Sequence, residues 1–378
     1  MTDSTALYIH IPFCRRRCAY CSFTSYEGRE ANIPAYVDAL TRELALYPAG
    51  LPVSSIYFGG GTPSLLPVNQ FDKLLSCIYP HFAVDETAEI TIEANPGTVD
   101  GKYLSFIRSL GINRLSLGVQ SLDDGELKTL GRIHTAADAL RSMSIARHAG
   151  FDNINLDIIY GIPGRKSDIW LRMLKDIISL EPEHLSLYPL TLDGDEPLHE
   201  AIERGEAEPL DTDAAADQYE LAGHMLASHG YLHYEISNWA RPGYECRHNV
   251  TYWLMRPYIG AGVAAHSYFD GRRCANTSDL DRYMASLSSN TRPARDLEER
   301  IGPDIELAEA MILGLRLTSG IDTAAIRSRY KVDLLERYSD QVRELAGLGL
   351  IERDGGRIRL TGRGRLLGNQ VFLRFMPD

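Results

Sequence analysis

Short apolar runs and longer amphipathic stretches alternate through the first half of the chain. Six of the short runs are rich in Ile, Val, Leu, Tyr and Thr, the residues that favour β-strands. They are LYIHIPF (7–13), SIYFGGG (55–61), EITIEAN (89–95), RLSLGVQ (114–120), NINLDIIYG (153–161) and HLSLYPLT (184–191). Between them, apolar residues recur at helical spacing over 34–47, 68–80, 99–110, 135–149 and 167–180.

This alternation of strand and helix predicts a parallel sheet joined by right-handed crossovers. The repeat is about 35 residues long, close to the unit of a (β/α)8 barrel, but the chain offers six such units. We therefore expect an α/β fold whose main part, residues 1–195, is a partial (β/α)6 TIM-like barrel that stays open.

The pattern changes after residue 195. A helix is expected over 211–229, followed by two β-like runs at 231–240 and 258–269. Residues 278–300 are polar and charged, which is typical of a linker. We treat residues 196–300 as an extension of the barrel that ends in this linker.

The last part of the chain, residues 301–378, combines helices with a hairpin. Helices are expected at 304–317, 322–328 and 333–347. The Asp-Gly-Gly at 354–356 separates two short β runs and indicates a tight turn between them. Helices followed by such a hairpin predict a small α+β, winged-helix-like domain.

The chain of 378 residues is acidic, with 39 basic and 51 acidic side chains and a net charge of −12. Nucleic-acid binding needs a basic surface, so we expect no nucleic-acid partner and a docking or capping role for the last domain. The polar start MTDSTA has no apolar signal segment, and no apolar run approaches the ~20 residues that span a bilayer. Six cysteines in a chain of this length do not form a disulfide pattern, so we expect a cytoplasmic protein, at most peripheral to a membrane.

Three of the six cysteines lie in one short segment, CRRRCAYC, at residues 14–21. Cys14, Cys18 and Cys21 have the spacing C-x3-C-x2-C, and thiolates are soft ligands for zinc or an iron–sulfur cluster. Structural zinc usually has four protein ligands, and His10 would have to be the fourth. A [4Fe–4S] cluster held by three thiolates would leave one iron open to a substrate or cofactor, and we favour this interpretation.

Polar residues recur where the six predicted strands end. The cysteine segment follows the first strand, and the later strands end at Gly59 to Gly61, at Glu93 and Asn95, at Gln120 and Ser121, near Asp157, and at Tyr188 and Thr191. In a parallel α/β fold the carboxyl ends of the strands meet at one edge, where ligands bind. Any one of these residues could serve a turn or cap, but six strand ends together predict a site.

The C-x3-C-x2-C segment followed by a GGGTP strand resembles the radical S-adenosylmethionine (SAM) family. The segments LYIHIPFC, GGGTPSLL, EANPGT, NRLSLGVQS, LGRIH, NLDIIYGIPG and YIGAGVAAHSY are similar to one branch of it. That branch contains oxygen-independent coproporphyrinogen III dehydrogenase (HemN) and its haem-chaperone relatives (HemW), and the resemblance covers nearly the whole chain. It implies that Cys14, Cys18 and Cys21 hold a [4Fe–4S] cluster whose open iron binds SAM.

The resemblance also implies a set of SAM-contacting residues: Tyr8, Gly60, Gly61, Thr62, Glu93, Gln120, Arg132 and Asp157. These roles are chemically reasonable, because glycine backbone can approach the SAM amino group and a guanidinium can neutralise a carboxylate. Two simpler alternatives stay open. Arg132 could pair with an acid on a helix, and Asp157 could cap a turn.

Three features favour the chaperone side of the branch over the dehydrogenase. Phe23 stands where the dehydrogenase pattern C-x3-C-x2-C-x-C has its last cysteine, and Tyr8 lies too near the start for the long segment that precedes the first strand in the dehydrogenase. The motif HNVTYW (248–253) is typical of the haem-chaperone type. The resemblance thus implies a protein that binds haem, a [4Fe–4S] cluster and SAM, and that transfers haem to acceptor proteins. The dehydrogenase is the alternative, and a radical SAM methyltransferase is a weaker one.

The HNVTYW segment suits haem on chemical grounds as well. Histidine is a common ligand of haem iron, and Tyr252 and Trp253 offer flat faces to a macrocycle. His248 and Tyr252 are four residues apart and would share one face of a helical turn. The residues alone favour a packed loop with a solvated His248, whereas the resemblance implies haem contact by His248, Tyr252 and Trp253, with Cys246 as another iron ligand to consider.

The resemblance also implies partners. They are haem-acceptor proteins, such as respiratory membrane proteins, and a low-potential electron donor that Arg15, Arg16 and Arg17 could attract. A homodimer is one option for the oligomeric state. His266 ends an apolar run and, by the resemblance, lies near the cofactor rim.

Overall fold

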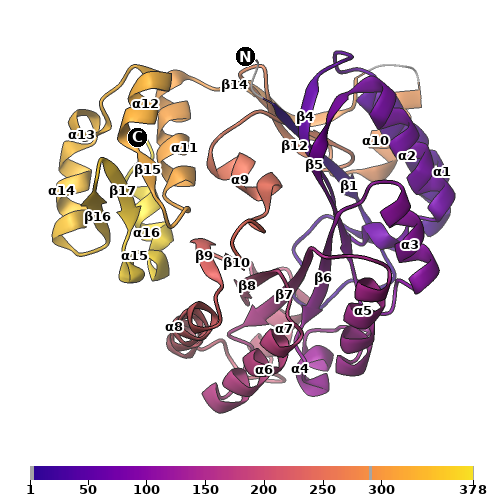
Figure 1. Cartoon of the computed structure of the whole chain (residues 1–378), viewed down its shortest axis with the longest axis horizontal. Coiled ribbons are helices and arrows are strands. Elements are labelled where there is room, and N and C mark those ends of the chain that lie inside the picture. Colours follow the sequence, from indigo (N-terminus) through magenta and orange to yellow (C-terminus); the bar gives the residue numbers. More distant parts are fainter. Residues whose placement is uncertain (1–3, 289–291, 378) are drawn as a thin grey trace.

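The computed structural model describes residues 4–288 and 292–377. Its centre is a curved sheet whose six middle strands are parallel and follow the order of the sequence (Figure 1). These strands are β1 (Thr5–Ile11), β4 (Pro52–Gly60), β5 (Ala83–Ala94), β6 (Arg114–Gln120), β7 (Ile154–Tyr160) and β8 (His184–Pro189). The six predicted strands and the partial (β/α)6 barrel are therefore confirmed.

Helices cover the outer face of this sheet, as Figure 1 shows for α1, α2, α3, α5 and α6. Their bounds are α1 (Ile33–Leu44), α2 (Val68–His81), α3 (Gly101–Ser109), α5 (Ala136–His148) and α6 (Ser167–Ser179), all within a few residues of the predicted ranges. Each turns an apolar face to the strands, and Trp170 of α6 is fully buried there. The short helices α4 (Asp124–Thr129) and α7 (Pro197–Glu203) were not predicted, because one or two turns carry too little periodicity.

The sheet continues beyond the barrel at both edges and reaches twelve strands. Next to β8 lie β10 (Asn238–Ala240) and β9 (Leu232–Glu235), and α8 (Thr212–Ser228) packs on α6. Next to β1 lies the parallel strand β11 (Tyr258–Ala261), followed by β12 (His266–Phe269), β13 (Arg272–Asn276) and β14 (Arg295–Arg300), which are antiparallel to one another. Each of the two predicted β-like runs is thus a pair of short strands.

The predicted linker at 278–300 is structured where it is described. It contains α10 (Leu280–Ser288) and β14, while residues 289–291 lie outside the described part. Leu280, Tyr283 and Leu287 are buried at helical spacing. These three apolar positions form one face of α10, but the many polar residues around them made the segment resemble a linker. The Tyr283 hydroxyl donates to the buried carboxylate of Glu43, which links α10 to α1.

The last domain has a hydrophobic core of its own, to the left in Figure 1. Its elements are α11 (Pro303–Gly314), β15 (Ile321–Asp322), α12 (Thr323–Tyr330), α13 (Leu334–Arg337), α14 (Ser339–Gly347), β16 (Ile351–Asp354), β17 (Arg357–Leu360), α15 (Gly362–Leu366) and α16 (Gly368–Leu373). β15, β17 and β16 form a small antiparallel sheet that includes the predicted hairpin. Within the described ranges, no helix has the length and apolar character that crossing a bilayer requires.

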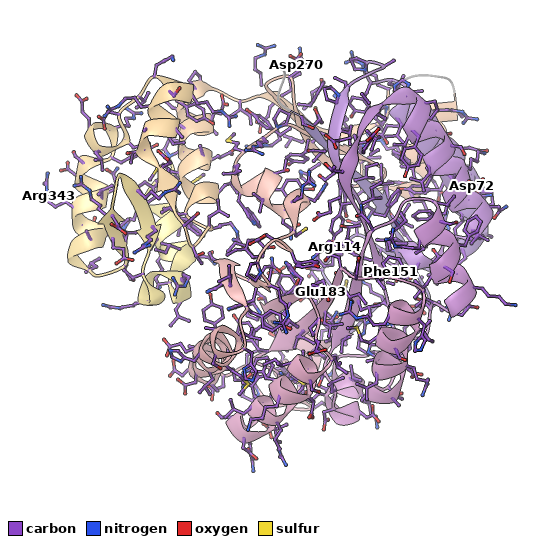
Figure 2. The ribbon with its side chains drawn as sticks, viewed as in Figure 1. Asp72, Arg114, Phe151, Glu183, Asp270 and Arg343 are labelled. Carbon is purple, nitrogen blue, oxygen red and sulfur yellow. The ribbon has the colours of Figure 1, made fainter. Side chains whose placement is uncertain are left out.

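Figure 2 shows how the side chains are distributed over this frame. Asp72, Asp270 and Arg343 lie at the periphery, whereas Arg114 of β6 lies near the middle of the molecule. The Arg114 side chain is 1% exposed, which is unusual for a cation and requires compensating groups around it.

Candidate functional site

The cysteine segment forms a closed loop at the carboxyl end of β1. The short strand β2 (Phe13–Cys14) pairs with β3 (Tyr26–Glu27), which brings the two ends of the loop together. Within it, the amide of Cys21 donates to the carbonyl of Cys18 at 3.3 Å, and the Arg17 guanidinium donates to the carbonyl of Cys21. The loop is thus held in shape by hydrogen bonds among its own residues, from the backbone and from the Arg17 side chain.

The three cysteines line a cavity of about 370 Å³ at the carboxyl ends of the parallel strands, which we call the first cavity. Of the residues that the family resemblance assigned to SAM, all but Tyr8 also line it: Gly60, Gly61, Thr62, Glu93, Gln120, Arg132 and Asp157. Tyr20, Asn155 and Ser186 line it too. Sequence reasoning missed these three, although Asn155 and Ser186 precede strand ends that were considered.

Glu93 is the next-to-last residue of β5 and lines the first cavity. Its oxygens accept hydrogen bonds from the Tyr57 hydroxyl at 2.9 Å and from the amide of Gly60 at 3.2 Å. Desolvation, with a contribution from the negative charge of Asp157, raises the pKa of Glu93 to about 7. Gly60 has φ +114, and a Cβ there would lie 2.5 Å from the His10 ring, so this position requires glycine.

The raised pKa of Glu93 predicts a pH-dependent stability. Because the folded-state pKa lies above the ordinary 4.5, the folded chain holds an extra proton between these values, and the free energy of unfolding falls as the pH rises through that window. Relative to Glu93→Gln, the wild type should lose on the order of 2 kcal/mol between about pH 5 and about pH 8. Urea unfolding of the cluster-free chains at both pH values measures this difference, and a constant difference would contradict the assignment.

Asp157 lies in the middle of β7 and therefore does not cap a turn. Its carboxylate accepts hydrogen bonds from the Ser116 hydroxyl and the Asn155 amide, both at 2.9 Å. Burial raises the pKa of Asp157 above its ordinary value. Polar neighbours on β6 and β7 thus fix a second carboxylate in the lining of the first cavity.

Arg132 places a cation beside the cysteine loop. Its Nη1 lies 3.4 Å from the Cys18 sulfur, and its Nη2 donates to the Asn95 side chain and the Gly118 carbonyl. Within the described part of the chain it forms no ion pair with an acid, and its Nε has no partner. The simpler alternative, in which Arg132 pairs with an acid on a helix, therefore does not apply to the described residues.

Backbone conformation shapes the remaining wall of the first cavity. Gln120 has φ +66, and the pairing of β6 with β7 shifts its register between Gly118 and Gln120. A non-glycine residue in this conformation is uncommon and is a typical feature of binding sites. The Thr62 hydroxyl lies 3.5 Å from the Cys14 sulfur and accepts a hydrogen bond from the Asn95 amide.

The donor set fits a cluster better than a single ion. Within the described residues, no three His, Cys, Asp or Glu side chains are gathered closely enough for one metal ion. His10 is engaged elsewhere, because its Nδ1 pairs with the Tyr8 hydroxyl and its Nε2 with the Thr24 carbonyl, both at 3.0 Å. The zinc alternative thus finds no support, whereas thiolates that each bind a different iron need not converge on one point.

A larger cavity of about 810 Å³, the second cavity, lies on the other side of the cysteine loop. It is lined by β1, by the C-terminal end of α9 (Arg247–Trp253), by β12 and by α11 of the last domain. Its aromatic and imidazole side chains include Tyr8, Phe23, Tyr252, Trp253, Tyr258 and His266. Ser22 and Phe23 line both cavities, so the residues just after Cys21 form the wall between them.

Two of the residues assigned from the resemblance lie differently from that expectation. Tyr8 faces the second cavity instead of the first, because its hydroxyl is held by His10 of the same strand face. His248 is 1% exposed and lines neither cavity, so it is not solvated. Its Nδ1 pairs with the Ser55 hydroxyl at 3.0 Å and its Nε2 with the Tyr252 hydroxyl at 2.7 Å.

The HNVTYW segment forms helix α9, and the four-residue spacing does bring His248 and Tyr252 together. Burial lowers the pKa of His248 to about 3, so the ring is neutral. Tyr252 and Trp253 line the second cavity, with the Arg316 guanidinium 4.3 Å from the Trp253 ring centre. Cys246, just before α9, is fully buried with its thiol on Glu89, away from both cavities.

Known proteins are similar to this chain over nearly its full length. The Radical SAM superfamily matches residues 8–177, and the HemN C-terminal domain matches residues 295–367. A Bacillus subtilis protein named "Heme chaperone HemW" is 34% identical over 375 residues, which cover 98% of this chain and 99% of that one. The chain belongs to the HemW family of radical SAM proteins. A Mycobacterium tuberculosis protein of the same name is 36% identical over 97% of this chain and 93% of its own.

The likeness to a solved structure agrees with membership of the HemW family. The chain superimposes on coproporphyrinogen III oxidase (HemN) from Escherichia coli, a radical SAM enzyme, with a TM-score of 0.86 and 25% identity, covering 99% of this chain and 90% of that one. The radical SAM superfamily implies a [4Fe–4S] cluster and SAM as cofactors. The first cavity, with three thiols, a cation and two carboxylates, has suitable chemistry for both.

Proposed function

We propose that this HemW-family protein is a haem chaperone, which binds haem, a [4Fe–4S] cluster and SAM and transfers haem to acceptor proteins. One observation carries the proposal: a second cavity of about 810 Å³ with aromatic walls from the HNVTYW helix lies directly beside the cysteine loop. Ligand sites are typically cavities of roughly this size with apolar and aromatic linings. The names of the HemW relatives support haem as the ligand.

In the first cavity, we assign Cys14, Cys18 and Cys21 as ligands of the cluster and Arg132 as the cation beside them. A reduced cluster there would supply one electron to bound SAM. Glu93 and Asp157 would accept hydrogen bonds from the SAM ammonium and ribose groups. The remaining assigned residues, Gly60, Gly61, Thr62 and Gln120, would form its walls, where a Cβ on Gly61 would lie 2.8 Å from the Phe13 carbonyl oxygen.

In the second cavity, we assign Tyr252 and Trp253 to contact with the porphyrin faces. His248 acts as a positioning residue, because its Nε2 holds the Tyr252 hydroxyl and neither of its ring nitrogens is free. Tyr8 belongs to the same wall rather than to the SAM site. Cys246 has no access to either cavity and is left out of the haem site.

We further propose a cytoplasmic protein whose acceptors include membrane-bound haem proteins. All six cysteines are free thiols, which suits a reducing compartment. Arg15, Arg16 and Arg17 are exposed at the mouth of the first cavity and form a basic surface for an acidic, low-potential electron donor. A homodimer would have to leave this surface free.

Oxidative decarboxylation of coproporphyrinogen III is the second candidate, favoured by the likeness to HemN. Phe23 argues against it: it occupies the wall between the cavities with 68% of its surface exposed, at the position where the dehydrogenase pattern has a cysteine.

Anaerobic assays of the cluster-loaded protein distinguish the two functions. We expect stoichiometric haem binding in a spectroscopic titration, because the aromatic second cavity is preformed. We expect no sustained formation of protoporphyrinogen from coproporphyrinogen III with SAM and a reductant. Escherichia coli HemN in the same assay is the positive control. Sustained product formation without haem binding would reverse the proposal.

A further inference from the structure

We propose that His266 supplies the nitrogen that binds the haem iron in the second cavity. The inference rests on the proposed function, because it names the iron ligand of a haem chaperone. It assigns this role to a residue outside the HNVTYW helix. Three observations carry it: the direction of the His266 side chain, the freedom of its ring, and the occupation of every other imidazole near the cavity.

Strand β12 aims His266 into the second cavity. His266 and Tyr268 are two residues apart and both line the cavity, whereas Ser267 between them is buried and bonds to the backbone of Gly260. Gly260 allows this close contact, since a Cβ there would lie 2.0 Å from the His266 carbonyl oxygen. The start of β12 is therefore fixed, with the imidazole on its cavity face.

The His266 ring is free to bind a ligand. It is exposed, and in the described part of the chain its nitrogens form no hydrogen bond or ion pair and its ring no aromatic contact. It lines the same cavity as Tyr252 and Trp253. A neutral imidazole with a free nitrogen is the commonest protein ligand of haem iron.

The other imidazoles near the cavity are already engaged. His10 also lines it, but its two nitrogens pair with the Tyr8 hydroxyl and the Thr24 carbonyl. His248 is buried behind Tyr252 with both nitrogens paired. Using either as a ligand would leave a buried polar partner without its hydrogen bond, which is energetically unfavourable. Iron binding by His266 would break no such hydrogen bond.

The test compares haem binding by cluster-loaded wild type, His266→Gly and His266→Gln under anaerobic conditions. We expect both variants to lose roughly tenfold or more in haem affinity and to show a changed Soret band, because the iron loses its protein ligand. Added imidazole should restore the wild-type spectrum in His266→Gly, with the haem retained through gel filtration. This rescue also shows that the variant is folded.

His224→Gly is the matched control, because His224 is an exposed histidine on α8 that lines neither cavity. It should bind haem as the wild type does, which excludes adventitious binding to surface histidines. Wild-type affinity and spectrum in His266→Gln would overturn the ligand assignment while leaving the chaperone intact. Failure of the wild type itself to bind haem would instead refute the proposed function.

Discussion

Replacing Cys18 with alanine is expected to abolish assembly of the [4Fe–4S] cluster. Cys18 lies between the other two cysteines in the loop, and its sulfur is the one that Arg132 contacts at 3.4 Å. Without this thiolate, two ligands would remain for a cluster that already relies on three, and one more iron would be exposed to solvent. Iron and acid-labile sulfide after anaerobic reconstitution, together with the visible absorption of the cluster, should fall to background.

Cys77→Ala is the matched control for this experiment. Cys77 is a half-buried thiol on α2 that is hydrogen-bonded to the Thr41 carbonyl and lines neither cavity. This variant should keep the iron and sulfide content of the wild type. A full cluster in Cys18→Ala, or an equal loss in both variants, would contradict the assignment of the C-x3-C-x2-C loop as the cluster site.

The sequence was sufficient for the barrel because its signals are local and repeated. Each strand and helix is one period of a regular pattern, and parallel strands in such a pattern fix their own order. The rule that ligands bind at the carboxyl ends of parallel strands then predicts that Glu93, Gln120 and Asp157 lie at one site, and all three line the first cavity. The topology of the sheet was therefore enough to predict this part of the candidate site.

The second cavity could not be predicted in the same way. Its walls come from segments far apart in the chain, such as Phe23, Trp253, His266 and Leu313, and only tertiary packing brings them together. The hydrogen-bond partners of a single side chain cannot be predicted from the sequence either. HNVTYW indicates a histidine near an aromatic pair, but not that Ser55 and Tyr252 occupy both nitrogens of His248.

The buried carboxylate of Glu89 provides the second large effect, because it anchors the HNVTYW helix to the barrel. Glu89 lies on β5 and is 6% exposed. Its oxygens accept hydrogen bonds from the amides of Arg247 and His248, both at 3.0 Å, and from the Cys246 thiol at 3.5 Å. The first amides of α9 thus depend on a residue more than 150 positions earlier in the chain.

Glu89 also balances the buried cation Arg114. Although burial by itself would lower the pKa of Arg114, the nearby Glu89 carboxylate raises it, so the guanidinium keeps its charge. A helix of seven residues such as α9 has little stability of its own and needs such tertiary contacts. Removing the carboxylate therefore leaves both an uncapped helix and a less compensated buried charge.

We accordingly expect Glu89→Ala to lower the free energy of unfolding by about 3 kcal/mol and to weaken haem binding, since Tyr252 and Trp253 lie on the released helix. Glu89→Gln should be intermediate, because it keeps an acceptor oxygen but loses the charge. Glu86→Ala is the matched control: Glu86 is exposed on the same strand, and its loss should change stability by less than about 0.5 kcal/mol. Urea unfolding and haem titration measure both effects. If Glu89→Ala is as stable as Glu86→Ala, α9 is held by its apolar packing and not by this carboxylate.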